Sequence, residues 1–132
     1  MATGAGRRGW AWAAIVLAFL AAVAALLPPR GTPGIEVADL GEVRALLLHF
    51  AGYAALALCA TLAQGRPRAV LTGLGLMAYA TALEFLQGVV GERSFQAQDL
   101  VANVMGVVVG ILVGCLIARR SRASRCQTPT QG

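Results

Sequence analysis

Residues 100–118 read LVANVMGVVVGILVGCLIA and contain no charged side chain. A helix of this length at 1.5 Å per residue is about 28 Å long, close to the thickness of the hydrocarbon core of a bilayer. Three more predominantly apolar stretches precede it, at residues 10–27, 43–62 and 69–88. The sequence therefore predicts an all-α integral membrane protein, a four-helix bundle in which each stretch spans the bilayer.

The composition of the whole chain excludes most other classes. Of the 132 residues, 58% are hydrophobic and 13% are charged, whereas a soluble domain has about 45–50% apolar and about 25% charged residues. A soluble chain of this size buries only about two-thirds of its surface and could not hide so much apolar area. The expected partner is thus the lipid bilayer and not nucleic acid, although the net charge is +5. The oligomeric state is not determined by these features.

The distribution of arginine predicts the orientation in the membrane. If the N-terminus is cytoplasmic, eight of the eleven basic residues lie in cytoplasmic segments, and only Arg30, Arg44 and Arg93 lie outside. Cytoplasmic loops carry the excess of basic residues, so the N-in/C-in arrangement is expected. Residues 1–9 then form a cytoplasmic N-terminus, residues 10–118 the four-span domain, and residues 119–132 a basic, disordered cytoplasmic tail.

The first apolar stretch also has features of a signal peptide, since Arg7 and Arg8 precede it. Its apolar run is longer than the 7–15 residues of a signal core. Its small-residue site, Ala22 to Ala24, lies inside that run and not after it. We therefore expect an uncleaved first span.

Polar residues interrupt the other three spans at one depth. His49 lies about five residues inside the outer end of the second span, Glu84 about four from the outer end of the third, and Asn103 about four into the fourth. An ionisable group at a helix centre costs about 2.5–3.5 kcal/mol on insertion scales, so such groups usually face protein or a water-filled cavity. We expect these three to face one another.

Helical spacing adds neighbours to each of them. Residues three or four positions apart share a face of a helix. In the second span the shared face holds Leu46, His49, Tyr53, Leu56 and Ala60. With the loop residue Arg93, the predicted polar cluster in the outer leaflet comprises His49, Tyr53, Glu84, Gln87, Arg93, Asp99 and Asn103. The cluster could be a functional site or only a set of interhelical hydrogen bonds.

Three glycines continue the polar face of the fourth span at four-residue spacing: Gly106, Gly110 and Gly114. Small residues at this spacing allow the backbones of two helices to approach closely. We expect a structural role in helix packing.

These residues resemble the motifs of the VanZ-like family of bacterial membrane proteins. His49-Phe50 with Tyr53 resembles the first motif of the family. A further set of residues resembles the second motif of the family: Glu84-Phe85-Leu86-Gln87, Arg93-Ser94, Asp99, Ala102-Asn103 and Gly106. The resemblance covers about residues 43–118 and implies a multi-pass protein of the bacterial inner (cytoplasmic) membrane, part of the cell envelope. It departs from the family pattern at Ala45 and Leu46, where many members carry an acidic–basic pair.

The resemblance implies a link to antibiotic resistance, because the family is named for a protein associated with resistance to the glycopeptide teicoplanin. We favour a non-enzymatic protein that binds an envelope amphiphile, such as a lipid-linked cell-wall precursor, with Arg93 meeting a phosphate or carboxylate. The alternatives are an intramembrane enzyme with His49 as general base and a structural partner in a membrane complex. A transporter is disfavoured, because the cytoplasmic halves of the spans lack ionisable residues.

The sequence leads us to assign no catalytic residue, metal or cofactor. His49, Glu84 and Asp99 could form a metal site with one histidine and two carboxylates, but no second histidine supports it. A hydrolase built from Ser94, His49 and Asp99 is disfavoured by the loop position of Ser94 and by the lack of a nucleophile-elbow motif.

Overall fold

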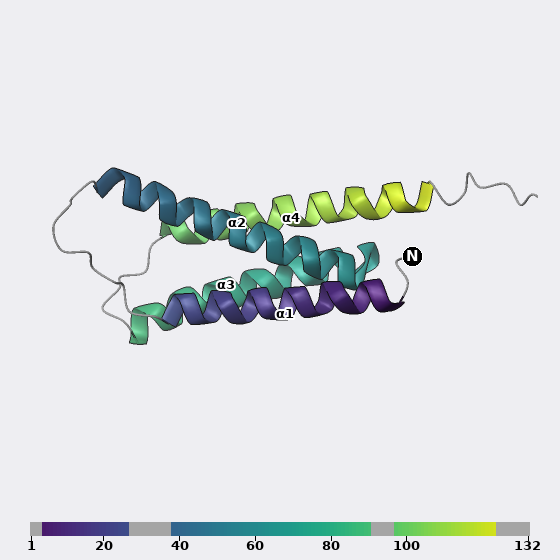
Figure 1. Cartoon of the computed structure of the whole chain (residues 1–132). Coiled ribbons are helices and arrows are strands. Elements are labelled where there is room, and N and C mark those ends of the chain that lie inside the picture. The colour runs from purple at the N-terminus through teal and green to yellow at the C-terminus, as the bar shows by residue number, and fades with distance from the viewer. Residues whose placement is uncertain (1–3, 27–37, 91–96, 124–132) are drawn as a thin grey trace, which may run out of the picture.

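The computed structural model describes residues 4–26, 38–90 and 97–123. These residues form four long helices, α1 (Gly4–Leu26), α2 (Ala38–Gln64), α3 (Ala69–Val90) and α4 (Ala97–Ala123), and a short 3-10 helix, η1 (Arg66–Arg68). Each long helix is long and apolar enough to cross a membrane. Successive helices run in opposite directions, so α1 begins and α4 ends at the same end of the bundle (Figure 1). The predicted all-α four-helix bundle is confirmed, whereas its orientation in the membrane stays a prediction.

The helices extend beyond the predicted spans. α2 begins at Ala38, before the predicted start at residue 43, and α4 continues to Ala123. The first part of the predicted cytoplasmic tail is therefore helical, and the rest of it lies outside the described residues. Hydropathy locates the apolar stretch, but backbone hydrogen bonding continues into the flanking turns wherever good helix formers such as Ala and Arg follow. Asp99 in the first turn of α4 also interacts favourably with the helix dipole.

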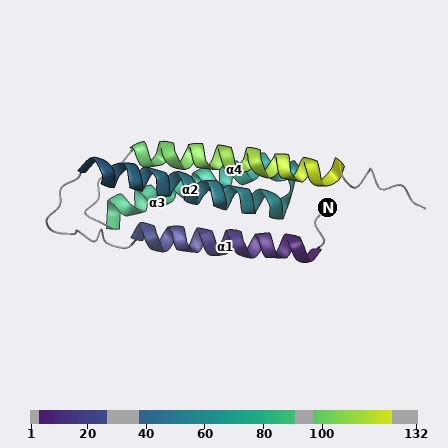
Figure 2. The same cartoon turned by 45° about the horizontal axis from the view of Figure 1, so that its top comes forward.

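α2 is the central helix of the bundle. It makes its most extensive contact with α4, and α1 packs against α2 and α3. α4 and α1 thus lie on opposite sides of α2 (Figure 2). The buried apolar core is contributed mainly by α2, with Ala80 of α3 and Val107 of α4. Large apolar side chains such as Phe19, Val70 and Phe85 remain exposed, as expected for a surface that contacts lipid.

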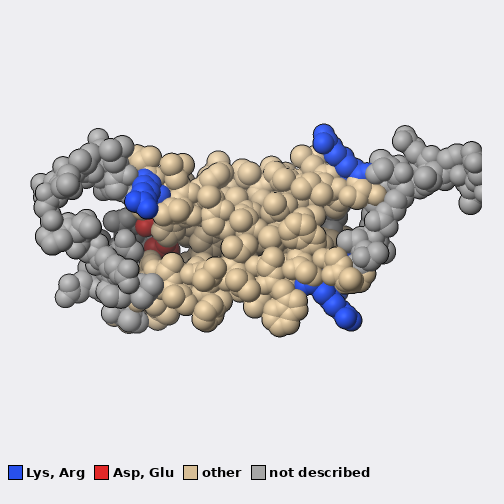
Figure 3. Space-filling view, in the orientation of Figure 1, with Lys and Arg blue, Asp and Glu red and all other residues tan. Residues whose placement is uncertain are grey.

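Charged side chains lie only toward the two ends of the visible face of the bundle. Figure 3 shows basic residues at both ends, a broad uncharged middle, and acidic residues recessed at one end. The acidic end is the one at which α2 and α4 begin (Figure 1). We call it the polar end of the bundle.

The close contact between α2 and α4 depends on the predicted glycines of α4. A Cβ atom built on Gly106 would lie within 3.0 Å of the Phe50 carbonyl oxygen, and one on Gly110 within 3.0 Å of the Ala54 carbonyl oxygen. Real Cβ atoms essentially never come so close to such atoms. The glycine stripe therefore faces α2 and lets the two backbones touch.

A glycine also ends α2. Gly65 has a φ of +85°, a left-handed conformation that costs little only for a residue without Cβ. Its N–H donates a hydrogen bond to the Thr61 carbonyl oxygen at 2.8 Å, as in a typical glycine cap at a helix C-terminus. Arg7 at the start of α1 donates to the Ala63 carbonyl oxygen at 2.9 Å. The start of α1 is thereby attached to the end of α2.

Thr61 provides a test of packing between α2 and α4. It is fully buried, and its hydroxyl oxygen has no hydrogen-bond partner among the described residues. Burial of an unpaired hydroxyl costs about 1–3 kcal/mol on mutational scales. We therefore expect Thr61→Val to raise the free energy of unfolding by about 1 kcal/mol, measured by thermal unfolding of the purified protein in detergent.

The matched control for Thr61 is Thr72→Val. The Thr72 hydroxyl is also buried, but it donates to the Arg68 carbonyl oxygen at 2.9 Å. This variant should not be more stable than the wild type. Equal destabilisation by both substitutions would contradict the prediction, because it would mean that the Thr61 hydroxyl makes a favourable interaction.

Candidate functional site

His49 joins α2 to α4 near the polar end of the bundle. Its Nδ1 and the Asn103 Oδ1 atom are 3.0 Å apart, and its Nε2 lies 3.7 Å from Asp99 Oδ2. An amide oxygen only accepts hydrogen bonds, so Nδ1 is the donor and carries the ring proton. In the neutral ring, Nε2 is then left with a lone pair on the side of Asp99. Asn103, which is 1% exposed, thus determines which nitrogen of His49 is available.

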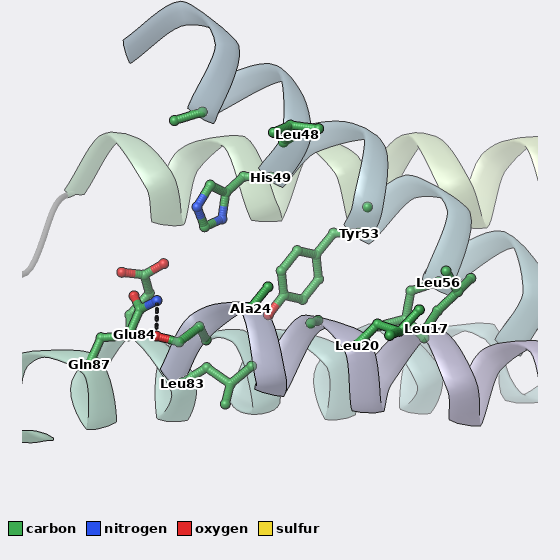
Figure 4. Close-up of a pocket in the computed structure, with 14 residues that line it drawn as sticks. Leu17, Leu20, Ala24, Leu48, His49, Tyr53, Leu56, Leu83, Glu84 and Gln87 are labelled. Atoms are coloured by element: carbon green, nitrogen blue, oxygen red, sulfur yellow. Dashed lines mark hydrogen bonds between the residues drawn. The ribbon is translucent and has the colours of Figure 1, made fainter. Parts of the chain in front are cut away.

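Glu84 approaches the same histidine from α3. Figure 4 shows the His49 ring and the Glu84 carboxylate pointing toward one another. One ligand atom each from His49, Glu84 and Asp99 can be chosen so that all three lie within 4.8 Å of one another. We call these three residues the acid–histidine cluster. Three different helices therefore bring together residues that are far apart in the sequence.

The electrostatics of the acid–histidine cluster favour a positive charge within it. Glu84 is 4% exposed, and the Asp99 side chain is 15% exposed. Two carboxylates this close repel one another, and poor solvation increases the repulsion. A bound cation would reduce it. The cluster can thus hold a cation, accept hydrogen bonds from a ligand, or offer His49 Nε2 as a base.

Two other residues of the predicted polar cluster lie beside the acid–histidine cluster. The Gln87 side-chain amide donates to the Ala25 carbonyl oxygen of α1 at 2.9 Å, the dashed line in Figure 4. Tyr53 is buried one turn along α2 from His49 and forms part of a pocket wall. Arg93 and Ser94 lie outside the described residues, so their predicted contributions stay predictions.

A pocket of about 400 Å³ lies beside the acid–histidine cluster, between α1, α2 and α3. One end of it is polar and is formed by His49, Glu84 and Gln87. The remaining wall is almost entirely apolar and includes Leu17, Leu20, Leu48, Leu56 and Leu83. Figure 4 shows the polar groups at one end and Leu17 and Leu56 at the other.

The contribution of α1 to this pocket was not predicted from the sequence. α1 contributes two leucines and three small residues, Ala21, Ala24 and Ala25. Small residues on a spanning helix indicate a face that packs closely against a neighbouring helix. These alanines were the only feature of the α1 sequence that could have predicted its contribution to the pocket. This signal is weak in α1, because alanine occurs on all sides of the helix.

Four helices long and apolar enough to span a membrane, with a buried glutamate, a histidine and a pocket near one end, define a multi-pass membrane protein with a polar site between its helices. A comparison with protein families matches residues 29–118 to the family described as VanZ/LLP1. The match covers most of the chain and includes the whole acid–histidine cluster. The chain therefore belongs to the VanZ family, as the resemblance of its motifs predicted. Searches of curated proteins and of solved structures gave no match.

Proposed function

We propose that the protein binds an amphiphile of the bacterial envelope in the pocket between α1, α2 and α3. The observation that carries this proposal is the division of the pocket into a polar end and an apolar wall. An acyl chain would lie along Leu17, Leu20 and Leu56, and its head group would meet His49 and Glu84. The volume of about 400 Å³ is within the usual range of small-molecule sites, about 300–1,000 Å³.

The polar end selects the chemistry of the head group. A carboxylate accepts hydrogen bonds, so hydroxyl and amino groups, as in a sugar or an aminoacyl group, are complementary to Glu84. An anionic head group needs a neighbouring positive charge, which is the role predicted for Arg93. A lipid-linked cell-wall precursor or a glycopeptide that carries an acyl chain combines these features.

The way α1 packs favours entry of the ligand from the membrane. None of the described side chains of α1 is buried, although α1 forms one side of the pocket. The helix that closes the pocket is therefore less tightly packed than α2 and α4. We infer that the protein acts in the bacterial inner membrane, where such amphiphiles reside, and that binding of this kind underlies a link to teicoplanin resistance.

An intramembrane enzyme is a second candidate, and the hydrogen bond by which Asn103 orients the His49 ring favours it. A histidine whose ring is positioned by neighbouring polar groups is a common general base. The amphiphile would then be a substrate. Turnover of a bound amphiphile by the purified protein, recorded by mass spectrometry, would favour the enzyme over the binding protein.

Gly52 offers a direct test of binding in the pocket. It lines the pocket, and a Cβ atom built on it would meet nothing within 4 Å. Gly52→Leu should therefore fold normally and place a side chain where the ligand would lie. In vesicles that contain a photoactivatable lysophospholipid, we expect the wild type to be labelled on Leu17 and Leu56 and the variant to lose this labelling.

The matched control for Gly52 is Gly75→Leu on α3. Gly75 also has nothing within 4 Å of a built Cβ atom, but it does not line the pocket. The pocket residues of the Gly75→Leu variant should be labelled like those of the wild type. Equal labelling of the pocket residues in all three proteins, or labelling confined to the lipid-facing surface, would contradict the proposal.

A further inference from the structure

We propose that His49, Glu84 and Asp99 bind a divalent first-row transition cation beside the polar end of the pocket. The ligand atoms would be His49 Nε2 and one carboxylate oxygen each from Glu84 and Asp99. This inference goes beyond amphiphile binding and does not depend on it, because the three ligands come from the protein alone.

The distances fit a shared cation better than a hydrogen bond. His49 Nε2 and Asp99 Oδ2 are 3.7 Å apart, whereas a hydrogen bond between nitrogen and oxygen is about 2.7–3.2 Å. Two ligand atoms that each lie about 2.1 Å from one cation are roughly 3.0–4.2 Å apart, depending on the angle between them. One ring nitrogen of His49 and one oxygen of each carboxylate lie within 4.8 Å of one another, at most slightly beyond this range.

Asn103 prepares His49 to be a ligand. Its amide oxygen accepts a hydrogen bond from the Nδ1 N–H, which leaves the Nε2 lone pair on the side of Asp99. A lone pair facing a carboxylate is unfavourable unless a cation or a proton lies between them. In known metal sites the ligating histidine almost always donates its other N–H to a carboxylate, a carbonyl or a water. Here the Asn103 side-chain carbonyl provides this contact from a fully buried position.

The charges and the donor atoms indicate the kind of cation. A divalent cation would balance the charges of Glu84 and Asp99 in a site where solvation is poor. Imidazole favours transition metals, and carboxylates favour harder cations, so the mixed set suits Mn²⁺ or Zn²⁺. Three protein ligands also leave coordination positions open. Such positions could hold water or an oxygen atom of a ligand in the adjoining pocket.

Titration of the purified full-length protein with Mn²⁺, followed by electron paramagnetic resonance, tests the proposal. Mn²⁺ binds poorly to thiols, so the cysteines of this chain do not compete for it. The protein should carry an affinity tag that lacks histidine. We expect the wild type to bind one Mn²⁺ per chain. No saturable binding of a single Mn²⁺ would overturn the proposal.

Isosteric variants identify the ligands. Asp99→Asn and Glu84→Gln keep the shape of the side chains but remove their charges, and His49→Ala removes the nitrogen. Each substitution should weaken Mn²⁺ binding by more than about 100-fold. Loss of a residue that only hydrogen-bonds to a metal ligand lowers metal affinity by up to about 100-fold, and loss of a ligand should cost more. Gln98→Ala removes an exposed amide that neighbours Asp99 in the sequence but does not line the pocket, and this variant should bind Mn²⁺ like the wild type. Equal weakening by Gln98→Ala would overturn the assignment.

A second measurement covers the case in which a ligand variant fails to elute as a single species. The chain contains one histidine, so the nitrogen resonances of labelled histidine belong to His49 without further assignment. On addition of Zn²⁺ to the wild type, we expect the Nε2 resonance to shift as for a metal-bound nitrogen while Nδ1 stays protonated. A ring that is protonated on both nitrogens at saturating Zn²⁺ would overturn the proposal.

Discussion

Replacement of Gly110 by Leu should abolish the folded bundle. Even a single Cβ atom at this position would lie within 3.0 Å of the Ala54 carbonyl oxygen and 2.8 Å from the Ala57 Cβ atom. Both neighbours belong to the backbone or are fixed to it, so no side-chain rotation can relieve the clash. Overpacking of a core typically costs about 1–3 kcal/mol and occasionally more. We therefore expect Gly110→Leu to give little monodisperse protein in size-exclusion chromatography in detergent.

A smaller substitution at Gly110, to alanine, tests the same contact through the melting temperature. Gly→Ala inside a helix normally stabilises by about 0.5–1 kcal/mol, because alanine loses less backbone entropy on folding. Gly75→Ala, where a Cβ atom meets nothing within 4 Å, should therefore keep or raise the melting temperature. Gly110→Ala should lower it. A shift of the same sign in both variants would contradict a close contact between α2 and α4 at Gly110.

Loss of the acid–histidine cluster should abolish the proposed protection against teicoplanin but not accumulation in the membrane. His49→Ala and Glu84→Ala replace residues that are costly to place in a bilayer, so insertion of the helices should not be impaired. In a teicoplanin-sensitive Gram-positive host, we expect the wild type to raise the inhibitory concentration of teicoplanin and both variants to leave it at the vector level. Membrane levels should be matched by immunoblot.

The matched control for these variants is Gln98→Ala. Gln98 precedes Asp99 on α4 but is exposed and lines a separate apolar surface groove, so its replacement should leave protection unchanged. If His49→Ala and Glu84→Ala lose protein and protection to the same extent, the polar residues serve as interhelical hydrogen bonds only. If the wild type gives no protection at good expression, the link to resistance does not hold for this protein.

The fold was predictable from the sequence because its signals are local. The apolar stretch at residues 100–118 predicts a span by its length and composition alone, and the structure places it inside α4. The glycines of α4 predicted a close helix contact through their spacing. The sequence could not identify the partner helix, because α2 meets them with ordinary residues such as Phe50 and Ala54.

The candidate site was predictable only in part. A common depth and a helical period were enough to bring His49, Glu84, Asp99 and Asn103 into one hypothesis. These sequence features could not distinguish the residues that surround His49 from Gln87, which instead donates a hydrogen bond to α1. Helical spacing predicted one inward face on α2. The structure shows a second face, on which Ala57 and Thr61 are fully buried.

The sequence by itself therefore determined the class of protein and its four apolar helices, and it predicted a common depth for the polar residues. These properties follow from the free energy of moving each side chain from water to lipid and from the helical repeat. Only the tertiary structure decided which helices touch, which nitrogen of His49 is available, and that a pocket opens beside α1. Those properties depend on the rotation of each helix about its axis, which is set by packing between residues far apart in the chain.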